Sequence, residues 1–287
     1  MDIPASCSAC SWTLERQEGC RYESHVKLFY EMSDRGVWSL GSKFILKERS
    51  NSPPNFEAAN LKFLRKETSI PLPDVLDDWT EDNGRYFLLM SRVPGVPLSS
   101  VWENMPASER ENIAKQTADY LVQLRKLQSE TMHALRDQPL YSASLFPTGY
   151  GLPHGPFSSD EELWADMSMA LKGVPEAVRL RLRERMPPAT PYTFTHGDLT
   201  YVNIMVKNGQ LTGIIDWESS GYFPVWWEYT CAGIGLGRGD KEWKTLLQQY
   251  MPCHADAREF WLDFYALTRY PDLDERGWKV LKDNDKA

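Results

Sequence analysis

The first third of the chain alternates apolar and polar positions in short runs that are separated by turn residues. Residues 26–30 and 37–40 form two such runs, and the polar residues 33–36 between them predict a tight turn. A third run follows over residues 43–48, where alternation places Lys43, Ile45 and Lys47 on one face of a strand. Three successive runs of this length predict the start of an antiparallel sheet.

A helical period replaces this alternation over residues 55–68, where apolar side chains recur every three or four positions. Ser52 and Pro53 precede the segment, and this pair predicts a capped helix start with proline in the first turn. Pro71 and Pro73 stop helical structure before the next strands begin. One amphipathic helix is therefore expected to pack against the sheet.

Beyond residue 80 the pattern predicts one more strand and then mainly helices. Length and periodicity distinguish the two, because buried strands are short apolar runs and helices carry a longer apolar stripe. The expected elements are a strand at 85–90, a core helix at 108–128, an ordered surface loop at 139–156, a helix starting with a capping box at 159–162, a basic helix at 176–186 and two or three helices within 241–287.

A β-hairpin is predicted from residues 204–206 and 211–215, because Asn208-Gly209 joins these two β-prone runs. Asn-Gly is favoured in two-residue hairpin turns, where both central residues need a positive φ. Such a hairpin returns the chain antiparallel, and the return brings Asp216 back beside Asn203. Two oxygen ligands from separate strand ends are then expected to meet one hard cation.

The chemistry suggested by this region is phosphoryl transfer. His196-Gly197-Asp198-Leu199 stands just before Asn203, and Asp216 follows thirteen residues later. The carboxylate of Asp198 can take the proton of an acceptor hydroxyl, while Asn203 and Asp216 can hold magnesium against phosphate oxygens. These three residue types in this order predict a metal-dependent kinase. A metal-dependent hydrolase that uses the same three residues without nucleotide remains an alternative.

Composition restricts the possible roles. The 287 residues are 42% hydrophobic and 25% charged, which is typical of a globular protein. A net charge of −8 argues against nucleic-acid binding and against binding to an anionic membrane, because both reward a basic surface. No apolar run is long enough to span a bilayer and no leader pattern is visible, so a soluble cytoplasmic protein is expected.

The five cysteines do not predict a disulfide framework, because their number is odd. Cys7, Cys10 and Cys20, with His25 as the nearby fourth ligand, form a possible zinc site. Half-sites of this kind arise easily by chance, so reduced thiols without metal are the favoured interpretation.

The motif around Asp198, together with Ile214-Ile215-Asp216-Trp217-Glu218, resembles the aminoglycoside phosphotransferase-like branch of the protein-kinase-like superfamily. The string from Gly221 to Tyr229 is similar to a group of this family that is abundant in fungi. The resemblance implies an α+β, bilobal protein-kinase-like fold. Its small N-lobe, an antiparallel sheet with one helix, would occupy residues 1–92, and its larger, mostly helical C-lobe would occupy residues 93–287, with ATP between the lobes.

The resemblance also implies roles for individual residues. Lys47, paired with Glu57, would position the phosphates of ATP, and His196 would brace the catalytic loop. The turn from Ser33 to Gly36 would lie over the phosphates. At the hinge, Met90 would border the adenine pocket and the backbone of Ser91 and Val93 would bind the adenine edge. In the C-lobe, Asp198 would be the catalytic base and Asn203 and Asp216 the magnesium ligands.

The implied function is ATP- and magnesium-dependent phosphorylation of a hydroxyl on a small molecule. Protein phosphorylation is disfavoured, because Asp216-Trp217-Glu218 replaces the Asp-Phe-Gly of protein kinases and no Ala-Pro-Glu stop follows. A nucleotide or metabolite sensor without activity is the main alternative, since fold and activity are separable. No protein partner follows from the sequence.

The acceptor stays open at this point. Acidic residues would attract a cationic sugar, whereas the aromatic cluster at 221–229 would suit an apolar metabolite, although packing beneath the site is favoured for Trp227 and Tyr229. The acidic candidates are Asp240, Glu242, Asp272 and Asp274.

Overall fold

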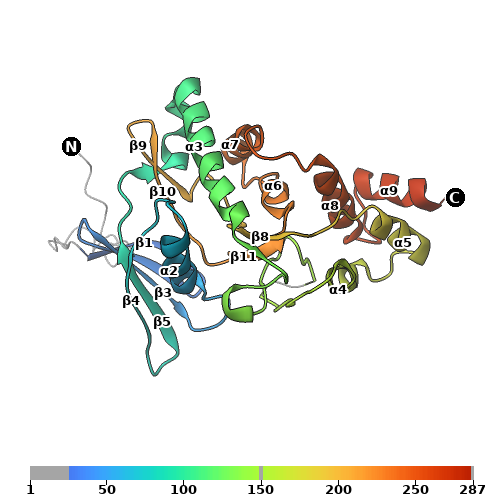
Figure 1. Ribbon diagram of the computed structural model, residues 1–287, viewed down its shortest axis with the longest axis horizontal. Coiled ribbons are helices and arrows are strands. Elements are labelled where there is room, and N and C mark those ends of the chain that lie inside the picture. The colour runs from blue at the N-terminus through green and yellow to red at the C-terminus, as the bar shows by residue number, and fades with distance from the viewer. Residues whose placement is uncertain (1–25, 149–150, 286–287) are drawn as a thin grey trace, which may run out of the picture.

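The computed structural model describes residues 26–148 and 151–285, which form two lobes (Figure 1). The predicted site at Cys7, Cys10, Cys20 and His25 lies outside these residues. The smaller lobe is a five-stranded antiparallel sheet of order β1-β2-β3-β5-β4. Its strands are β1 (Val26–Met32), β2 (Arg35–Leu40), β3 (Phe44–Ser50), β4 (Val75–Thr80) and β5 (Arg85–Ser91).

The predicted strands of this lobe are confirmed, with one change at the first turn. The turn between β1 and β2 contains only Ser33 and Asp34, because Met32 pairs with Arg35 across the hairpin. Gly36 lies inside β2, where it pairs with Glu48 of β3. The predicted four-residue turn is therefore a two-residue turn.

One face of the sheet is covered by the helix α2 (Glu57–Glu67), as the periodicity predicts. Alternate residues of β5 are buried toward it, and Tyr86, Leu88 and Met90 form a small core with Ala58 of the helix. The predicted cap is wrong. The helix begins at Glu57 after Phe56, and no side chain caps it.

The larger lobe is mostly helical (Figure 1). Its α-helices are α3 (Ala107–Lys126), α4 (Asp160–Met167), α5 (Glu176–Glu184), α6 (Trp227–Cys231), α7 (Arg238–Gln248), α8 (Ala255–Leu267) and α9 (Glu275–Asp285). Its short 3-10 helices are η1 (Leu98–Ser100), η2 (Trp102–Asn104), η3 (Leu135–Asp137) and η4 (Ser168–Leu171). The capping box at α4 is confirmed in part: the Ser159 hydroxyl accepts from the Glu162 amide at 3.2 Å, but the Glu162 carboxylate accepts from Ser158 instead.

Two small sheets lie among these helices and carry the predicted catalytic residues. One has the order β10-β9-β6 and the other β11-β8-β7. The strands are β6 (Val96–Pro97), β7 (Gln128–Ser129), β8 (Tyr192–Thr195), β9 (Ile204–Lys207), β10 (Gln210–Ile214) and β11 (Gly221–Pro224). The last strand of the five-stranded sheet ends at Ser91, and the strands of the two small sheets begin after it. The exact division into an N-lobe of residues 1–92 and a C-lobe of residues 93–287 stays a prediction.

Two hydrophobic cores stabilise the larger lobe. Trp226 and Trp227 are about 1% exposed and pack in one of them with Phe260 and Trp261, which confirms the packing interpretation for Trp227. The segment 139–156 is more than a surface loop, because its Leu145 and Phe146 are fully buried in the same core. The sequence did not predict this burial, because the aromatic and proline-rich composition of the segment has no periodicity.

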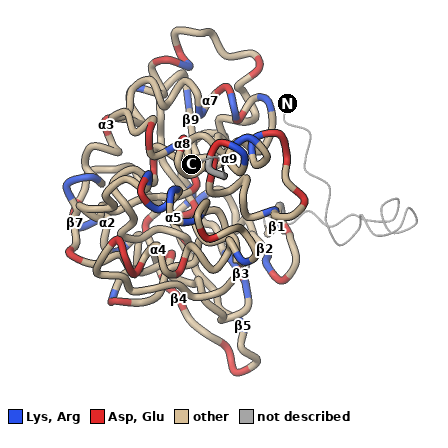
Figure 2. Tube along the Cα trace, turned by 90° about the vertical axis from the view of Figure 1, so that its right-hand side faces the viewer, with Lys and Arg blue, Asp and Glu red and all other residues tan. Residues whose placement is uncertain are grey.

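In the view of Figure 2, acidic and basic positions both occur along much of the trace. Among the described residues, none of the helices combines the length and apolar character that crossing a bilayer requires.

Candidate active site

The loop between β8 and β9 carries the predicted catalytic base. His196, at its start, is fully buried, and burial lowers the pKa of its imidazole to about 4. The neutral ring accepts from the Asp198 amide at Nδ1 (3.1 Å) and bonds the Ile215 carbonyl at Nε2 (3.0 Å). His196 therefore holds Asp198 and the segment leading to Asp216 in fixed relative positions, which matches its predicted bracing role.

The carboxylate of Asp198 is exposed to solvent but has protein on most sides. This partial loss of water, with the negative charges of Asp216 and Asp240 nearby, raises the pKa of Asp198 to about 6 against the opposing charge of Lys244. The Asn203 Nδ2 atom donates to the Asp198 carbonyl at 2.9 Å and to Asp198 Oδ2 at 3.1 Å. The amide oxygen of Asn203 is thus the atom suited to a metal.

The hairpin of β9 and β10 brings the metal-ligand candidates together as predicted. Asn208 and Gly209 have φ values of 52° and 69°, the positive φ at both positions that this turn requires. Beyond the hairpin, the Ile215 amide donates to the Asn203 carbonyl at 3.0 Å. Asp216 therefore follows directly after a residue bonded to Asn203.

Lys47 joins the two lobes. Its Nζ atom lies 2.7 Å from Glu57 Oε2 and 2.7 Å from Asp216 Oδ1. Burial disfavours the charge on Lys47, but Asp216 and Glu57 outweigh it and raise the pKa of the ammonium group. Conversely, burial favours the neutral form of Asp216, but Lys47 outweighs it and lowers the pKa of that carboxyl. The predicted pair of Lys47 with Glu57 is confirmed.

The hinge residues lie at the end of the first sheet. Met90 is buried, the Ser91 amide donates to the Asp74 carbonyl at 2.8 Å, and Val93 packs on Gly213, where a β-carbon would lie 2.5 Å from Val93 Cγ1. The Ser91 amide is thus already bonded within the smaller lobe. Nothing in these contacts tests nucleotide binding by Ser33 or Gly36.

Sequence reasoning missed an arginine pair at the segment Asp216-Trp217-Glu218. Glu218 accepts from Arg35 Nη1 and from Arg49 Nη1, each at 2.5 Å. The intervening Trp217 is fully buried and donates from Nε1 to the Ile214 carbonyl at 2.8 Å. The only sequence signal was Glu218 itself, two residues after a ligand candidate.

Two buried carboxylates support the loop that carries Asp198, a role that the sequence did not predict for either. Glu228 accepts from the amides of His196 (2.6 Å) and Gly197 (3.2 Å), and burial raises its pKa to about 7. Asp240 accepts from the Tyr201 amide at 2.8 Å and lies 3.3 Å from Lys244 Nζ. Both residues fix the loop from helices of the larger lobe.

The prediction that Asp240 attracts a cationic acceptor is wrong, because the Asp240 side chain is fully buried and already bonded. Asp272 and Asp274 lie between α8 and α9, at the opposite end of the molecule from the first sheet (Figure 1).

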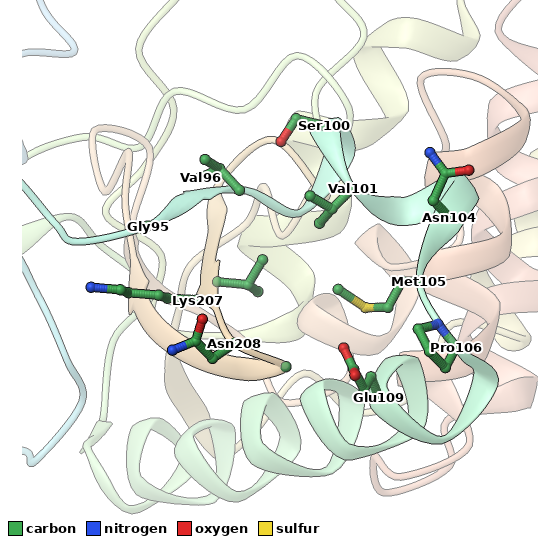
Figure 3. A pocket seen from close by; sticks show the side chains of 12 residues that line it. Gly95, Val96, Ser100, Val101, Asn104, Met105, Pro106, Glu109, Lys207 and Asn208 are labelled. Atoms are coloured by element: carbon green, nitrogen blue, oxygen red, sulfur yellow. The ribbon is translucent and has the colours of Figure 1, made fainter. Parts of the chain in front are cut away.

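A surface pocket of about 620 Å³ lies between the tip of the β9–β10 hairpin, the segment 95–106 and the start of α3 (Figure 3). Val96, Met105, Glu109 and Lys207 are among the residues that line it, and none of the predicted site residues does. The pocket is therefore separate from the chemistry described above.

The donor set fits magnesium. Among residues 26–148 and 151–285, three or more His, Cys, Asp or Glu side chains nowhere gather as a cage for a metal. Magnesium does not need one, because it is usually held by one or two carboxylates together with substrate phosphates and water. The oxygens of Asn203 and Asp216 would supply the protein part of such a site.

Comparison with known proteins agrees with this geometry. A family model described as "Phosphotransferase enzyme family" matches residues 34–260. The chain belongs to this family. The matched range contains every predicted site residue except Ser33, so this phosphotransferase carries its candidate site within the family region.

Solved structures share the fold. The streptomycin–ATP complex of APH(2'')-IIa matches with a TM-score of 0.55 and 14% identity over 92% of each chain. APH(4)-Ia matches with a TM-score of 0.58 and 14% identity over 90% of each chain. The GDP complex of aminoglycoside 2'-phosphotransferase-IIIa matches with a TM-score of 0.56 and 15% identity over 93% of this chain and 94% of that one. The predicted bilobal, protein-kinase-like α+β fold is confirmed.

Proposed function

We propose that this phosphotransferase uses ATP and magnesium to phosphorylate a hydroxyl group of a small molecule. The observation that supports this most is the double contact of Lys47, which bonds Glu57 of its own lobe and Asp216 of the other. This contact supports the proposal because it holds the cationic Lys47, the proposed phosphate ligand, next to a metal-ligand candidate. Asp198, on the loop held to the same segment by His196, supplies a base.

Asp198 is suited to accept the proton of the acceptor hydroxyl. With a pKa of about 6, the carboxylate is mostly ionised at neutral pH and still basic enough to accept a proton. The Asn203 amide donates to Oδ2, which leaves Oδ1 as the oxygen that takes the proton. Solvent exposure of Asp198 allows a small acceptor to reach it.

The remaining residues of the proposed site would position the nucleotide. Lys47 would hold the α and β phosphates, with Glu57 fixing the direction of its ammonium group. Met90 would border the adenine, and the carbonyl of Ser91 with the backbone of Val93 would bind its edge, while the turn at Ser33 and the start of β2 at Gly36 would cover the phosphates. Asn203 and Asp216 would hold magnesium, which would neutralise part of the phosphate charge.

The comparisons support nucleotide use without choosing the nucleotide. Proteins of this fold have been solved with ATP, with ADP and with GDP, and several of them with aminoglycosides. ATP is proposed here because the sequence resembles the ATP-using catalytic core. The small-molecule acceptor is proposed from the accessible Asp198.

Phosphate transfer from ATP to a panel of alcohols tests the proposal. The panel contains sugars, amino alcohols, choline-like compounds and terpenoid alcohols, with ADP release and product mass as readouts. We expect turnover with one class, and a loss of about 10³-fold in Asp198→Asn, which removes the base without changing shape. Asp272→Asn, a distant exposed position, is the matched control. Failure of the wild type to bind or consume any nucleotide would overturn the proposal.

A further inference from the structure

The helix α2 carries a fully buried polar side chain, Asn60, which has no part in the function proposed above. Its neighbours Leu61 and Leu64 are buried in the hydrophobic core that contains Trp217. A side-chain amide among apolar groups costs free energy unless its polar atoms find hydrogen-bond partners. The partners of Asn60 therefore indicate what this residue contributes.

The amide nitrogen of Asn60 faces the segment that follows Asp216. Asn60 Nδ2 donates to the Trp217 carbonyl at 2.7 Å and lies 3.4 Å from the Ser220 carbonyl. Both partners are acceptors only, so the nitrogen of the amide is the atom that must face them. Among residues 26–148 and 151–285, the buried Asn60 Oδ1 atom has no hydrogen-bond partner. A buried amide with an unpaired oxygen and both contacts on one segment indicates a specific role at that segment.

The backbone of Asp216 is in a conformation that needs support. Its φ is 67°, in the left-handed region that residues other than glycine rarely adopt, and such a conformation persists only where the surroundings hold it. The next residue, Trp217, is held at its carbonyl by Asn60 and at its indole by the Ile214 carbonyl (2.8 Å). These contacts on both sides of Asp216 hold the turn from which its carboxylate reaches Lys47.

The segment held by Asn60 also contacts the loop of the candidate base. The Ser220 hydroxyl donates to the His196 carbonyl at 3.2 Å, and the Trp217 ring meets the His196 ring edge-on with centroids 4.4 Å apart. His196 in turn accepts from the Asp198 amide. Through Asn60, the helix of the smaller lobe therefore contacts a segment that lies between both candidate carboxylates.

We propose that Asn60 is a positioning residue of the phosphoryl-transfer site, which holds the Trp217 carbonyl so that the Asp216 carboxylate stays directed at the metal. This inference rests on the proposed function and adds to it a second connection from α2. Glu57 acts through Lys47, whereas Asn60 acts through the backbone that follows Asp216. The two residues are three positions apart, so they lie on the same face of the helix. One helix thus positions both the phosphate-binding cation and the metal-binding carboxylate.

The test measures binding of a nonhydrolysable ATP analogue by calorimetry, with magnesium and without it. In Asn60→Leu, which keeps the size of the side chain and removes its donors, we expect roughly tenfold weaker binding with magnesium and a change of less than about twofold without it. The difference arises because Lys47 and Glu57 are left intact. If Asn60→Leu does not fold, Asn60→Ala gives the same comparison without a risk of overpacking.

Thr117→Val is the matched control, because the hydroxyl of Thr117 is also fully buried but bonds the Ile113 carbonyl of its own helix at 2.8 Å. It should lower the resistance to urea without changing the effect of magnesium on binding.

A double variant tests the route of the effect. In the Asp216→Asn background, Asn60→Leu should weaken binding with magnesium by less than about twofold further, because it acts through the carboxylate already removed. Equal weakening with and without magnesium in Asn60→Leu, or a full further loss in the double variant, would overturn the inference and leave the proposed function intact. A wild type that binds no nucleotide would overturn both.

Discussion

The two carboxylates of the candidate site differ in the contacts that hold them. The loop carrying Asp198 is held from the larger lobe, where Glu228 accepts from the amides of His196 and Gly197. The segment carrying Asp216 is held from the first sheet, through Lys47 at 2.7 Å. The loop with the candidate base is therefore held from the larger lobe, whereas the segment with Asp216 also bonds the first sheet.

Their electrostatics differ in the same way. Loss of water raises the pKa of Asp198 to about 6, whereas the nearby Lys47 charge lowers the pKa of Asp216 despite its burial. A proton acceptor needs a raised pKa and a metal ligand needs to stay ionised. Contacts from the larger lobe should thus govern the chemical step, and contacts from the first sheet should govern nucleotide binding.

The largest expected difference between the two regions is the effect of Asp216→Asn and of Asp198→Asn on nucleotide affinity. In Asp216→Asn we expect turnover to fall by about 10³-fold and affinity for magnesium–nucleotide to fall by roughly tenfold or more, because an ionised metal ligand is removed. Asp198→Asn should lose a similar amount of turnover with affinity unchanged within about twofold. Steady-state kinetics and calorimetry measure both quantities. If Asp198→Asn weakened nucleotide binding as much as Asp216→Asn does, the division between the regions would be wrong.

The sequence was sufficient to predict those contacts of the site that join residues close together in the chain. Asn208-Gly209 specifies its turn by the φ values it tolerates, so the approach of Asn203 and Asp216 could be predicted. Lys47 and Glu57 are ten residues apart on adjacent elements, and their pairing was predicted with the help of the family resemblance.

The contacts that could not be predicted depend on how distant elements pack. Glu218 meets Arg35 and Arg49 across more than 160 residues, and no periodicity in the chain reports such a meeting. Asp240 was a candidate for attracting a cationic acceptor, yet it is fully buried and accepts from the Tyr201 amide of the loop that carries Asp198. Periodicity within a helix or strand predicts which of its faces is buried, but it does not predict which distant element packs against that face.

Glu228→Ala should destabilise the larger lobe and slow the chemical step. Two amides lose their acceptor in a buried position, so we expect a loss of about 2–3 kcal/mol in the free energy of unfolding at pH 6, measured by urea denaturation. Turnover should fall because Asp198 is less well placed, with affinity for nucleotide unchanged. A fall in nucleotide affinity without a fall in turnover would contradict the comparison.

Glu228→Gln is the control, because its amide oxygen still accepts from the loop. The pKa of Glu228 is raised by burial from 4.5 to about 7, so the folded state binds more protons than the unfolded state between these values. The contribution of this group to stability is present below pH 4.5 and is lost as the pH rises through 7. Glu228→Gln should therefore flatten the decline of stability between pH 5 and pH 8.

The pH dependence of turnover should give the smallest effect, and it should identify the group that accepts the proton. Asp198 must be ionised to accept a proton, so kcat/KM should fall as the pH drops through about 6, approaching tenfold per unit below that value. Asp216, whose pKa is lowered, stays ionised over this range, and His196, with a pKa of about 4, stays neutral. Glu228 is the competing group, since it titrates near 7. The fall in kcat/KM near pH 6 should persist in Glu228→Gln and should vanish from the residual activity of Asp198→Asn. If it disappeared in Glu228→Gln instead, the titrating group would be Glu228 and not Asp198.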